Sequence, residues 1–260
     1  MKKIAFTLVG ILTLALTSCM KDTGSRYTST FSRVVTIDES TTPVMLTADC
    51  TGEVFSKFEN LKYADQLADF GLAGAKRAEV QIKLDVDASY YQTLTMMQAQ
   101  RIETQAVTNI ETPEPTMPFV GWQQKHLGGI YAPTVWVSAG YLNVMPQIPS
   151  AQSGKYHLTA DSVAGDTLFF KLSATYDRND SKRLIDYLQC YDLRTLRDTT
   201  EASPEMRVKM RAALETLRRH YRDSVRIVLT GDFIEYNYNR QGRDTIKTGY
   251  HITNYFKYNF

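Results

Sequence analysis

The chain has 260 residues, 43% of them hydrophobic and 22% charged, which is enough for two folded domains. Lysine and arginine number 30 against 28 aspartates and glutamates, and this near balance excludes nucleic-acid binding driven by overall charge. The 16 tyrosines and 11 phenylalanines favour a fold rich in β-strands.

The N-terminal segment has the organisation of an export signal. Lys2 and Lys3 precede an uncharged, mostly apolar run over residues 4–16. A transmembrane helix needs roughly 20 apolar residues, so this run is too short to span a bilayer. Its length instead fits the hydrophobic part of a secretory signal, which is about 7–15 residues long.

The signal ends in Leu16-Thr17-Ser18-Cys19, which resembles a bacterial lipobox. That resemblance implies that the Cys19 thiol receives a diacylglycerol and that cleavage makes Cys19 the first mature residue. We therefore predict a lipoprotein signal peptide over residues 1–18 and a polar tether over 19–30. The alternative is an ordinary cleaved signal followed by a chance cysteine.

Residues 31–112 are predicted to form a small OB-like β-barrel. "FSRVVTI", "PVMLTADCTGEVF" and "AEVQIKLDVD" have strand patterns, and the last alternates apolar with polar residues. A short helix-like stretch over residues 60–70 ends at Gly71. Two further strands are expected over 90–98 and 101–108, which gives enough strands for a small barrel.

A proline-rich linker is predicted over residues 113–120, because Pro113, Pro115 and Pro118 disfavour a central strand. Residues 121–260 are predicted to form an antiparallel β-sandwich, whose last hairpin turns near Gln241 and Gly242. The mainly β fold is interrupted by one inserted helix over residues 204–222. Ser203 is a good N-cap for it, and Pro204 suits its first position.

Several stretches together resemble the NigD-like lipoproteins of Bacteroidetes-type bacteria. They are the lipobox, "LAGAKRAEVQIKLDVD", "VWVSAGYLNV", "KYHLTAD", "LSATYDRND" and "LQCYDLRTL", in the same order as in that family. The resemblance implies an N-terminal OB-like domain and a C-terminal β-sandwich, with no catalytic residues. It also implies a role in immunity to a bacteriocin. The inserted helix departs from the family pattern.

No nucleophile, metal or phosphate-binding motif is present, so we predict no catalytic, metal or cofactor-binding residue and no enzyme. Two buried free thiols are favoured over a disulfide for Cys50 and Cys190. A calcium site at Asp177, Asn179 and Asp180 competes with a polar turn, which is favoured. The histidines are scattered without ligand spacing: His126, His157, His220 and His251.

Four arginines of the predicted helix fall within roughly 60° of one another on a helical wheel: Arg207, Arg211, Arg218 and Arg222. A solvated face is the simpler interpretation, and contact with lipid headgroups, lipopolysaccharide phosphates or an acidic partner is the alternative. Four aromatic residues could stack on sugars, although a place in the core is favoured for them: Tyr90, Tyr91, Trp122 and Trp136.

The sequence thus predicts a lipid-anchored protein of the cell envelope, at the outer membrane and with a weak preference for its periplasmic face. We expect a non-enzymatic binding module whose partner is a bacteriocin-type toxin, another envelope protein or a glycan, and not nucleic acid. The alternatives are a glycan-binding accessory protein and a polysaccharide hydrolase. A hydrolase requires a cleft with two suitably spaced carboxylates.

Overall fold

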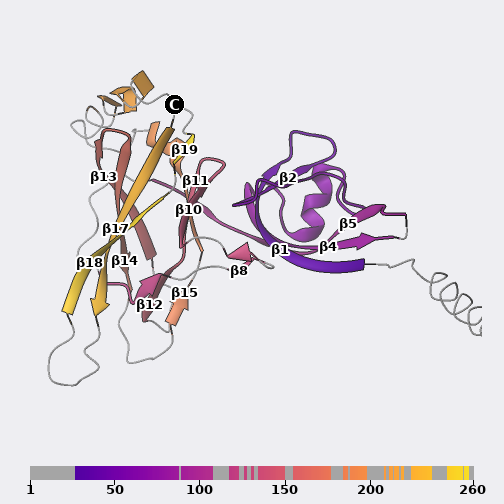
Figure 1. Cartoon of the computed structure of the whole chain (residues 1–260), viewed down its shortest axis with the longest axis horizontal. Coiled ribbons are helices and arrows are strands. Elements are labelled where there is room, and N and C mark those ends of the chain that lie inside the picture. Colours follow the sequence, from indigo (N-terminus) through magenta and orange to yellow (C-terminus); the bar gives the residue numbers. More distant parts are fainter. Residues whose placement is uncertain are drawn as a thin grey trace, which may run out of the picture.

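The computed structural model describes two groups of strands that lie beside each other along the long axis of the molecule (Figure 1). The mainly β fold is therefore confirmed. The described residues are 27–87, 89–107, 117–122, 126–127, 130–131, 134–149, 155–176, 184–186, 188–197, 208, 211–212, 214–216, 218–219, 224–235, 245–253 and 255–257.

The first domain is one strongly curved antiparallel sheet with the strand order β3-β2-β1-β4-β5. Phe58, just beyond β3, makes a parallel bridge with Leu94 of β5, so the two edges of the sheet meet there. This arrangement is a partly open, OB-like barrel. Its strands are β1 (Tyr27–Asp38), β2 (Met45–Ala48), β3 (Val54–Phe55), β4 (Arg77–Val86) and β5 (Gln92–Arg101).

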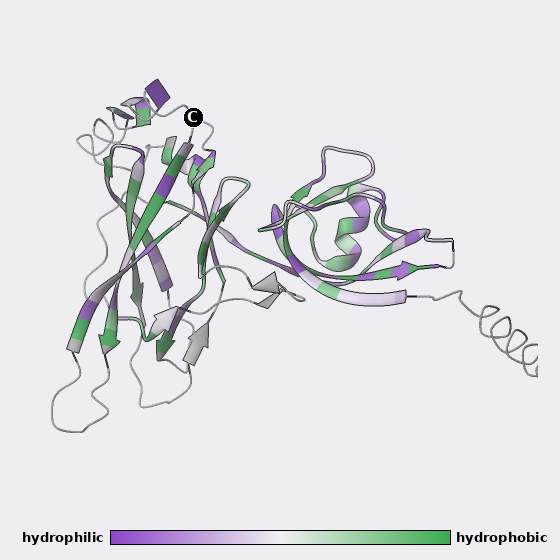
Figure 2. Ribbon diagram, viewed as in Figure 1, coloured by the Kyte–Doolittle hydropathy of each residue, from purple (hydrophilic) through white to green (hydrophobic). Residues whose placement is uncertain are grey.

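A short 3-10 helix, η1 (Ala64–Phe70), connects β3 to β4 and lies inside the curve of the sheet (Figure 1). Its Leu67 is fully buried, beside Val80 and Ile82 of the alternating strand β4. Gly71 ends the helix with φ 70°, a left-handed conformation that glycine adopts without steric cost. Figure 2 shows hydrophobic and hydrophilic residues alternating along these strands.

The second domain packs one large sheet against two smaller ones. The large sheet contains β13 (Lys155–Ala164), β14 (Thr167–Thr175), β17 (Ser224–Glu235) and β18 (Thr245–Ile252), and β19 (Phe256–Lys257) also pairs with β17. One facing sheet has the order β10-β11-β16-β6, with β10 (Val135–Ser138), β11 (Tyr141–Val144), β16 (Gln189–Asp192) and β6 (Thr104–Ala106). The other has the order β15-β12-β7, with β15 (Leu184–Asp186), β12 (Pro146–Pro149) and β7 (Gly121–Trp122).

Apolar side chains from both layers form a single core, which includes Leu158, Leu172 and Leu229 from one layer and Leu142 and Tyr191 from the other. A two-residue pair, β8 (His126–Leu127) with β9 (Ile130–Tyr131), and a second 3-10 helix, η2 (Leu193–Arg197), complete the described elements.

Two pairings in this sandwich are parallel, β14 with β17 and β16 with β6. The two sheets that contain these pairs are therefore mixed, with both parallel and antiparallel neighbours. The parallel partners are joined by long connections, because a hairpin can join only antiparallel strands. β6 lies within the range that the sequence assigned to the first domain, yet it pairs with β16 of the second. The turn expected near Gln241 and Gly242 lies outside the described residues.

Within the range predicted as the inserted helix, the described residues are helical: 208, 211–212, 214–216 and 218–219. Leu214 is buried against the core of the sandwich. Arg211 and Arg218 are exposed. Ser203 and Pro204, the predicted start of this helix, lie outside the described residues.

Candidate binding groove

A groove of about 750 Å³ opens on the first domain, where the loop between β1 and β2, the segment after β3 and the start of β5 come together. Loops between strands 1 and 2 and between strands 4 and 5 are where OB-folds bind their ligands. The groove is lined by Thr42, Pro43, Ser56, Lys57, Phe58, Glu59, Lys62, Tyr63, Tyr91, Gln92, Thr93 and Leu94.

Tyr63 stands immediately before η1, and its backbone is fixed by Gln66. The Gln66 Oε1 atom accepts hydrogen bonds from the backbone N–H groups of Lys62, at 2.7 Å, and Tyr63, at 3.0 Å. The Gln66 N–H in turn donates to the Tyr63 carbonyl at 3.1 Å. Tyr63 is 57% exposed, so a hydrogen-bonded turn presents its ring to solvent.

Tyr91 is held by a turn around Asp87. The Asp87 Oδ1 atom accepts from the backbone N–H groups of Ser89, at 2.8 Å, and Tyr91, at 2.9 Å. The Asp87 N–H donates to the Tyr91 carbonyl at 3.0 Å. Tyr91 is 70% exposed and lines the groove. Its neighbour Tyr90 is 86% exposed and is not among the lining residues.

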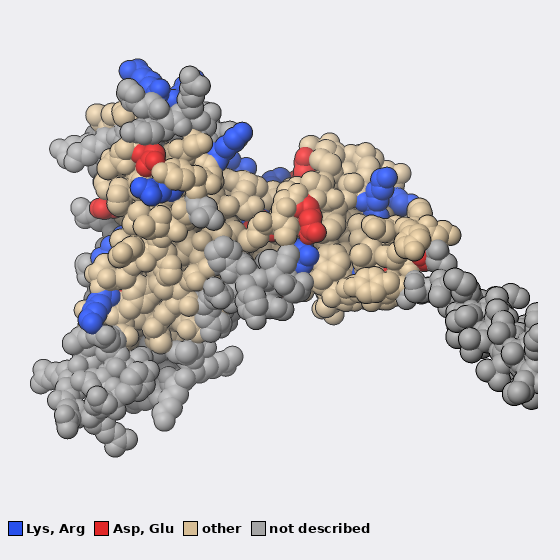
Figure 3. All heavy atoms as spheres, in the orientation of Figure 1, with Lys and Arg blue, Asp and Glu red and all other residues tan. Residues whose placement is uncertain are grey.

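The charged groups of the groove are Lys57, Glu59 and Lys62, all exposed. None of the three forms an ion pair with another residue in the described part of the chain. Two lysines and one glutamate give the lining a formal charge of +1, and Glu59 is the single carboxylate among the described lining residues. Figure 3 shows both charge signs interspersed on the face in view.

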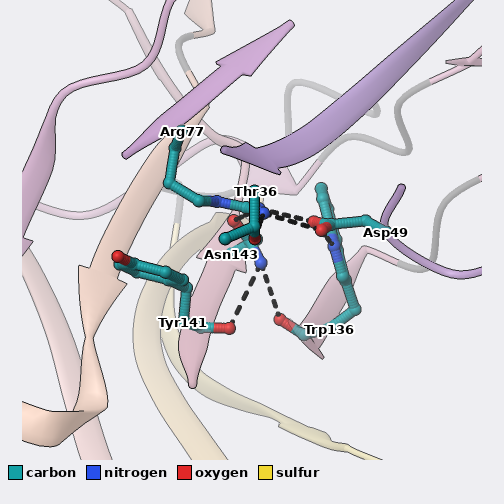
Figure 4. Close-up of polar contacts among 6 residues, drawn as sticks. All are labelled: Thr36, Asp49, Arg77, Trp136, Tyr141 and Asn143. Atoms are coloured by element: carbon teal, nitrogen blue, oxygen red, sulfur yellow. Dashed lines mark hydrogen bonds and ion pairs between the residues drawn. The ribbon is translucent and has the colours of Figure 1, made fainter. Parts of the chain in front are cut away.

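A buried polar cluster lies where the two domains meet (Figure 4). Arg77 of β4 is fully buried, and its guanidinium donates to both carboxylate oxygens of Asp49, at 2.7 and 2.5 Å. The same guanidinium donates to Thr36 Oγ1 at 2.7 Å and to Asn143 Oδ1 at 3.0 Å. Trp136 Nε1 donates to Asp49 at 2.8 Å. The first domain is thus bonded to β10 and β11 of the second.

The cluster shifts the pKa values of Arg77 and of the nearby Cys190. Burial alone would lower the pKa of Arg77, but the hydrogen bonds and charge of Asp49 raise it above its usual value. Cys190 faces Asn143 in the adjacent strand and lies near the Arg77 guanidinium. Burial raises the pKa of the Cys190 thiol, and the charge of Arg77 opposes that rise only partly.

The structure describes only some of the site residues that the sequence predicted. Cys19, Arg207 and Arg222 lie outside the described residues, as do Asp177, Asn179, Asp180 and His220. Arg211 and Arg218 are exposed, and Arg219 forms an ion pair with Glu215 at 3.8 Å. The described part of the chain contains no group of three or more His, Cys, Asp or Glu residues that could hold a metal.

The aromatic candidates divide into two kinds. Trp136 is 5% exposed and belongs to the domain contact, as the preference for a core position predicted. Tyr90 and Tyr91 are highly exposed, so a core position is wrong for both. Trp122 is half-buried and packs its ring against Phe119, Phe233 and His251.

Both described cysteines are free thiols, as favoured from the sequence. Cys190 is buried as expected, but Cys50 is exposed, and the expected burial of Cys50 is wrong. The reason is local, because Cys50 lies in the tight turn after β2 and not in the strand itself. Its φ of 65° takes the residue out of the alternation of buried and exposed positions that the strand follows.

Sequence patterns missed Tyr63, Arg77 and Asp49. The Tyr63 position was visible only as a polar stretch before a short helix, and nothing in it indicated a groove. Arg77 and Asp49 flank apolar strand patterns, where charged residues ordinarily face water. Their burial depends on partners elsewhere in the chain.

No protein-family model matches the chain. No curated protein matches its sequence. Among solved structures, a candidate lipoprotein from Bacteroides fragilis NCTC 9343 is 12% identical with a TM-score of 0.54, and the alignment covers 88% of this chain and 99% of that one. This similarity shows a shared fold over nearly the whole length of that protein.

Two further similar structures align less closely. A candidate toxin-related protein from Parabacteroides distasonis ATCC 8503 is 14% identical with a TM-score of 0.42, covering 86% of this chain and 93% of that one. A NigD-like immunity protein from Bacteroides caccae ATCC 43185 is 11% identical with a TM-score of 0.41, covering 85% and 92%. A NigD-like immunity protein is therefore among the structures to which the chain is similar.

No helix in the described part of the chain is long and apolar enough to cross a membrane.

Proposed function

We propose that this protein is a lipid-anchored component of the cell envelope that acts as a non-enzymatic binding module, with the groove of its first domain as the ligand site. The observation that carries this proposal is the groove itself. It presents Tyr63 and Tyr91 on hydrogen-bonded turns, together with charged groups that have no ion-pair partner among the described residues. Such a combination of aromatic and polar groups suits ligand binding.

The lipobox ending at Cys19 supports the anchor, and so does the fold shared with the candidate lipoprotein of Bacteroides fragilis. Two or three acyl chains, at ~0.8 kcal/mol per buried methylene, make an anchor that does not dissociate in practice. Placement at the outer membrane, on its periplasmic face, is part of the proposal.

A hydrolase of envelope polysaccharide is a weaker candidate for this groove. Glycoside hydrolysis ordinarily uses two carboxyl groups that flank the scissile bond. Glu59 is the one carboxylate among the described lining residues, so the groove provides an acceptor for hydrogen bonds and no acid–base pair. Immunity to a bacteriocin, which the NigD-like resemblance implies, remains one form that the binding function could take.

The described residues of the inserted helix, which include Arg211 and Arg218, lie far from the start of β1. In Figure 1 the described helical residues lie at one end of the long axis, whereas β1 begins at the other end. The eight residues that follow Cys19, up to and including Tyr27, reach at most ~29 Å when extended. We therefore favour an acidic partner molecule over the anchoring membrane as the contact of Arg211 and Arg218, with Arg207 and Arg222 included by sequence.

The anchor is tested with a Cys19→Ser variant. We expect the variant to leave the membrane fraction and to lack the mass of the acyl groups. Retention of the variant in sedimented envelopes, with an unchanged mass, would contradict the anchor.

The binding function is tested by capture from solubilised envelopes. The wild-type lipoprotein is compared with a Tyr63→Ala/Tyr91→Ala variant and with a Tyr90→Ala control. We expect a component that the wild type and the control retain and the double variant loses. Identical capture by all three proteins would show that the groove is not the ligand site.

A further inference from the structure

The groove has the chemistry of a carbohydrate site, and we propose that it binds an oligosaccharide chain. This inference rests on the proposed binding function, because it names the ligand class of the same groove. Four properties of the groove support this proposal. They are tyrosine rings that stack on no other ring among the described residues, side chains that both donate and accept hydrogen bonds, a formal charge of only +1, and backbone groups that are already hydrogen-bonded.

The two tyrosine rings come from different loops and converge on one groove. Neither ring stacks on another aromatic ring or on a guanidinium among the described residues. The faces of Tyr63 and Tyr91 are therefore free to cover the apolar C–H face of a sugar ring, a contact that combines dispersion with the removal of apolar area from water.

Sugar hydroxyls both donate and accept hydrogen bonds, and the lining provides both roles. Lys57 and Lys62 donate, Glu59 accepts, and the amide of Gln92 does both. Ser56 and Thr93 add hydroxyl groups. The turns that hold the tyrosines are already formed, so little conformational freedom is lost on binding.

The charge of the groove argues against a nucleic-acid strand. Binding of single strands requires a strongly positive channel along the phosphate backbone. The lining carries a formal charge of +1, from two lysines and one glutamate.

The floor of the groove argues against an extended peptide. A peptide that adds a strand needs a free sheet edge with unpaired backbone groups. Here Phe58 and Leu94 already form a bridge, and the Glu59 N–H donates to the Leu94 carbonyl at 2.9 Å. The backbone groups between β3 and β5 are therefore already hydrogen-bonded to each other at this point. A ligand in the groove would be bound by side chains.

The test measures binding of the detergent-solubilised lipoprotein to chitotetraose, mannotetraose and cellotetraose by calorimetry. An array that contains peptidoglycan fragments, lipopolysaccharide O-chains and neutral plant glycans then identifies the source of the sugar. Tyr63→Ala and Tyr91→Ala are each expected to weaken binding of the best probe about fivefold or more. Tyr90→Ala, which removes an exposed tyrosine outside the groove, is expected to leave binding unchanged.

Failure of every glycan on the array would overturn the carbohydrate assignment, and so would an equal loss in the Tyr90→Ala control. Binding of an oligodeoxynucleotide or a peptide in place of a glycan would overturn it as well. If a component is still captured through the groove from solubilised envelopes, only the ligand class fails. If the groove captures nothing, the proposed binding function fails with it.

Discussion

Arg77 of the first domain and Asn143 of the second are hydrogen-bonded, Nη2 to Oδ1, at 3.0 Å, although 66 residues separate them in the chain. The Asn143 amide in turn donates to the backbone carbonyl of Tyr141 at 3.2 Å. A buried charge without its partner at this contact would destabilise the folded state, because only the charged and hydrogen-bonding partners offset the free-energy cost of removing that charge from water. The contact therefore fixes how the two domains meet.

Replacement of Arg77 by methionine is expected to destabilise the protein by about 3–5 kcal/mol, because it leaves the Asp49 carboxylate buried without its cation. Urea denaturation measures the change. Lys76→Met is the matched control, since the adjacent Lys76 pairs with Glu39 at the surface and such pairs contribute about 0–1 kcal/mol. Adding Asp49→Asn to Arg77→Met should recover part of the loss, and a further decrease would contradict this account.

Trp136→Phe keeps an aromatic ring at the domain contact but removes the indole N–H that donates to Asp49. We expect a loss of about 1–3 kcal/mol, the usual cost of a buried acceptor that loses a donor. Trp122→Phe serves as the comparison, because the Trp122 side chain makes ring contacts and its indole N–H forms no hydrogen bond with the described residues. Equal losses in the two variants, measured by thermal unfolding, would show that the hydrogen bond to Asp49 has little importance.

Stability is expected to fall as the pH drops from 7 towards 5. Burial lowers the pKa of His251, and burial followed by the charge of Lys155 lowers the pKa of His157. A histidine with a lowered folded-state pKa contributes stability that is complete above the unfolded value of about 6.5 and is lost as the pH falls through the folded value.

The measurement is the urea midpoint as a function of pH. A His157→Gln/His251→Gln variant should show a flatter dependence between pH 7 and 5, whatever its absolute stability. A slope equal to that of the wild type would assign the dependence to other groups.

Thiol labelling should distinguish the two cysteines of the folded part. Burial, and then the charge of Asp49, raise the pKa of the Cys50 thiol to about 11, although the residue as a whole is exposed. Because the thiolate is the reactive form, Cys50 should react with iodoacetamide at pH 8 at least tenfold more slowly than in the unfolded chain, by an order-of-magnitude estimate. Cys190 should react only on unfolding.

The experiment uses the Cys19→Ser variant, with mass spectrometry of the labelled peptides. Rapid labelling of Cys190 in the native protein would mean that the domain contact opens frequently.

Local patterns predicted much of the fold correctly, but their limits are clear at particular residues. The alternation of Val80, Ile82 and their polar neighbours gave β4 its buried face, and Gly71 marked the end of η1. The parallel pairing of β6 with β16 was not predictable, because no local pattern reports which distant strand lies alongside. The groove was missed for the same reason, since its lining comes from three separate segments.

The sequence by itself predicted an export signal and acylation at Cys19, and it determined the mainly β character of the fold, because these features depend on residues close together in the chain. Only the tertiary structure decided that Arg77 and Asp49 are buried and that Tyr63 and Tyr91 share a groove. The physical reason is that burial depends on contacts with residues that are distant in sequence. A charged side chain is buried where such residues pair with it, and an aromatic ring stays exposed where none of them covers it. Arg77 finds its partners 28, 41 and 66 residues away, and no local pattern encodes those distances.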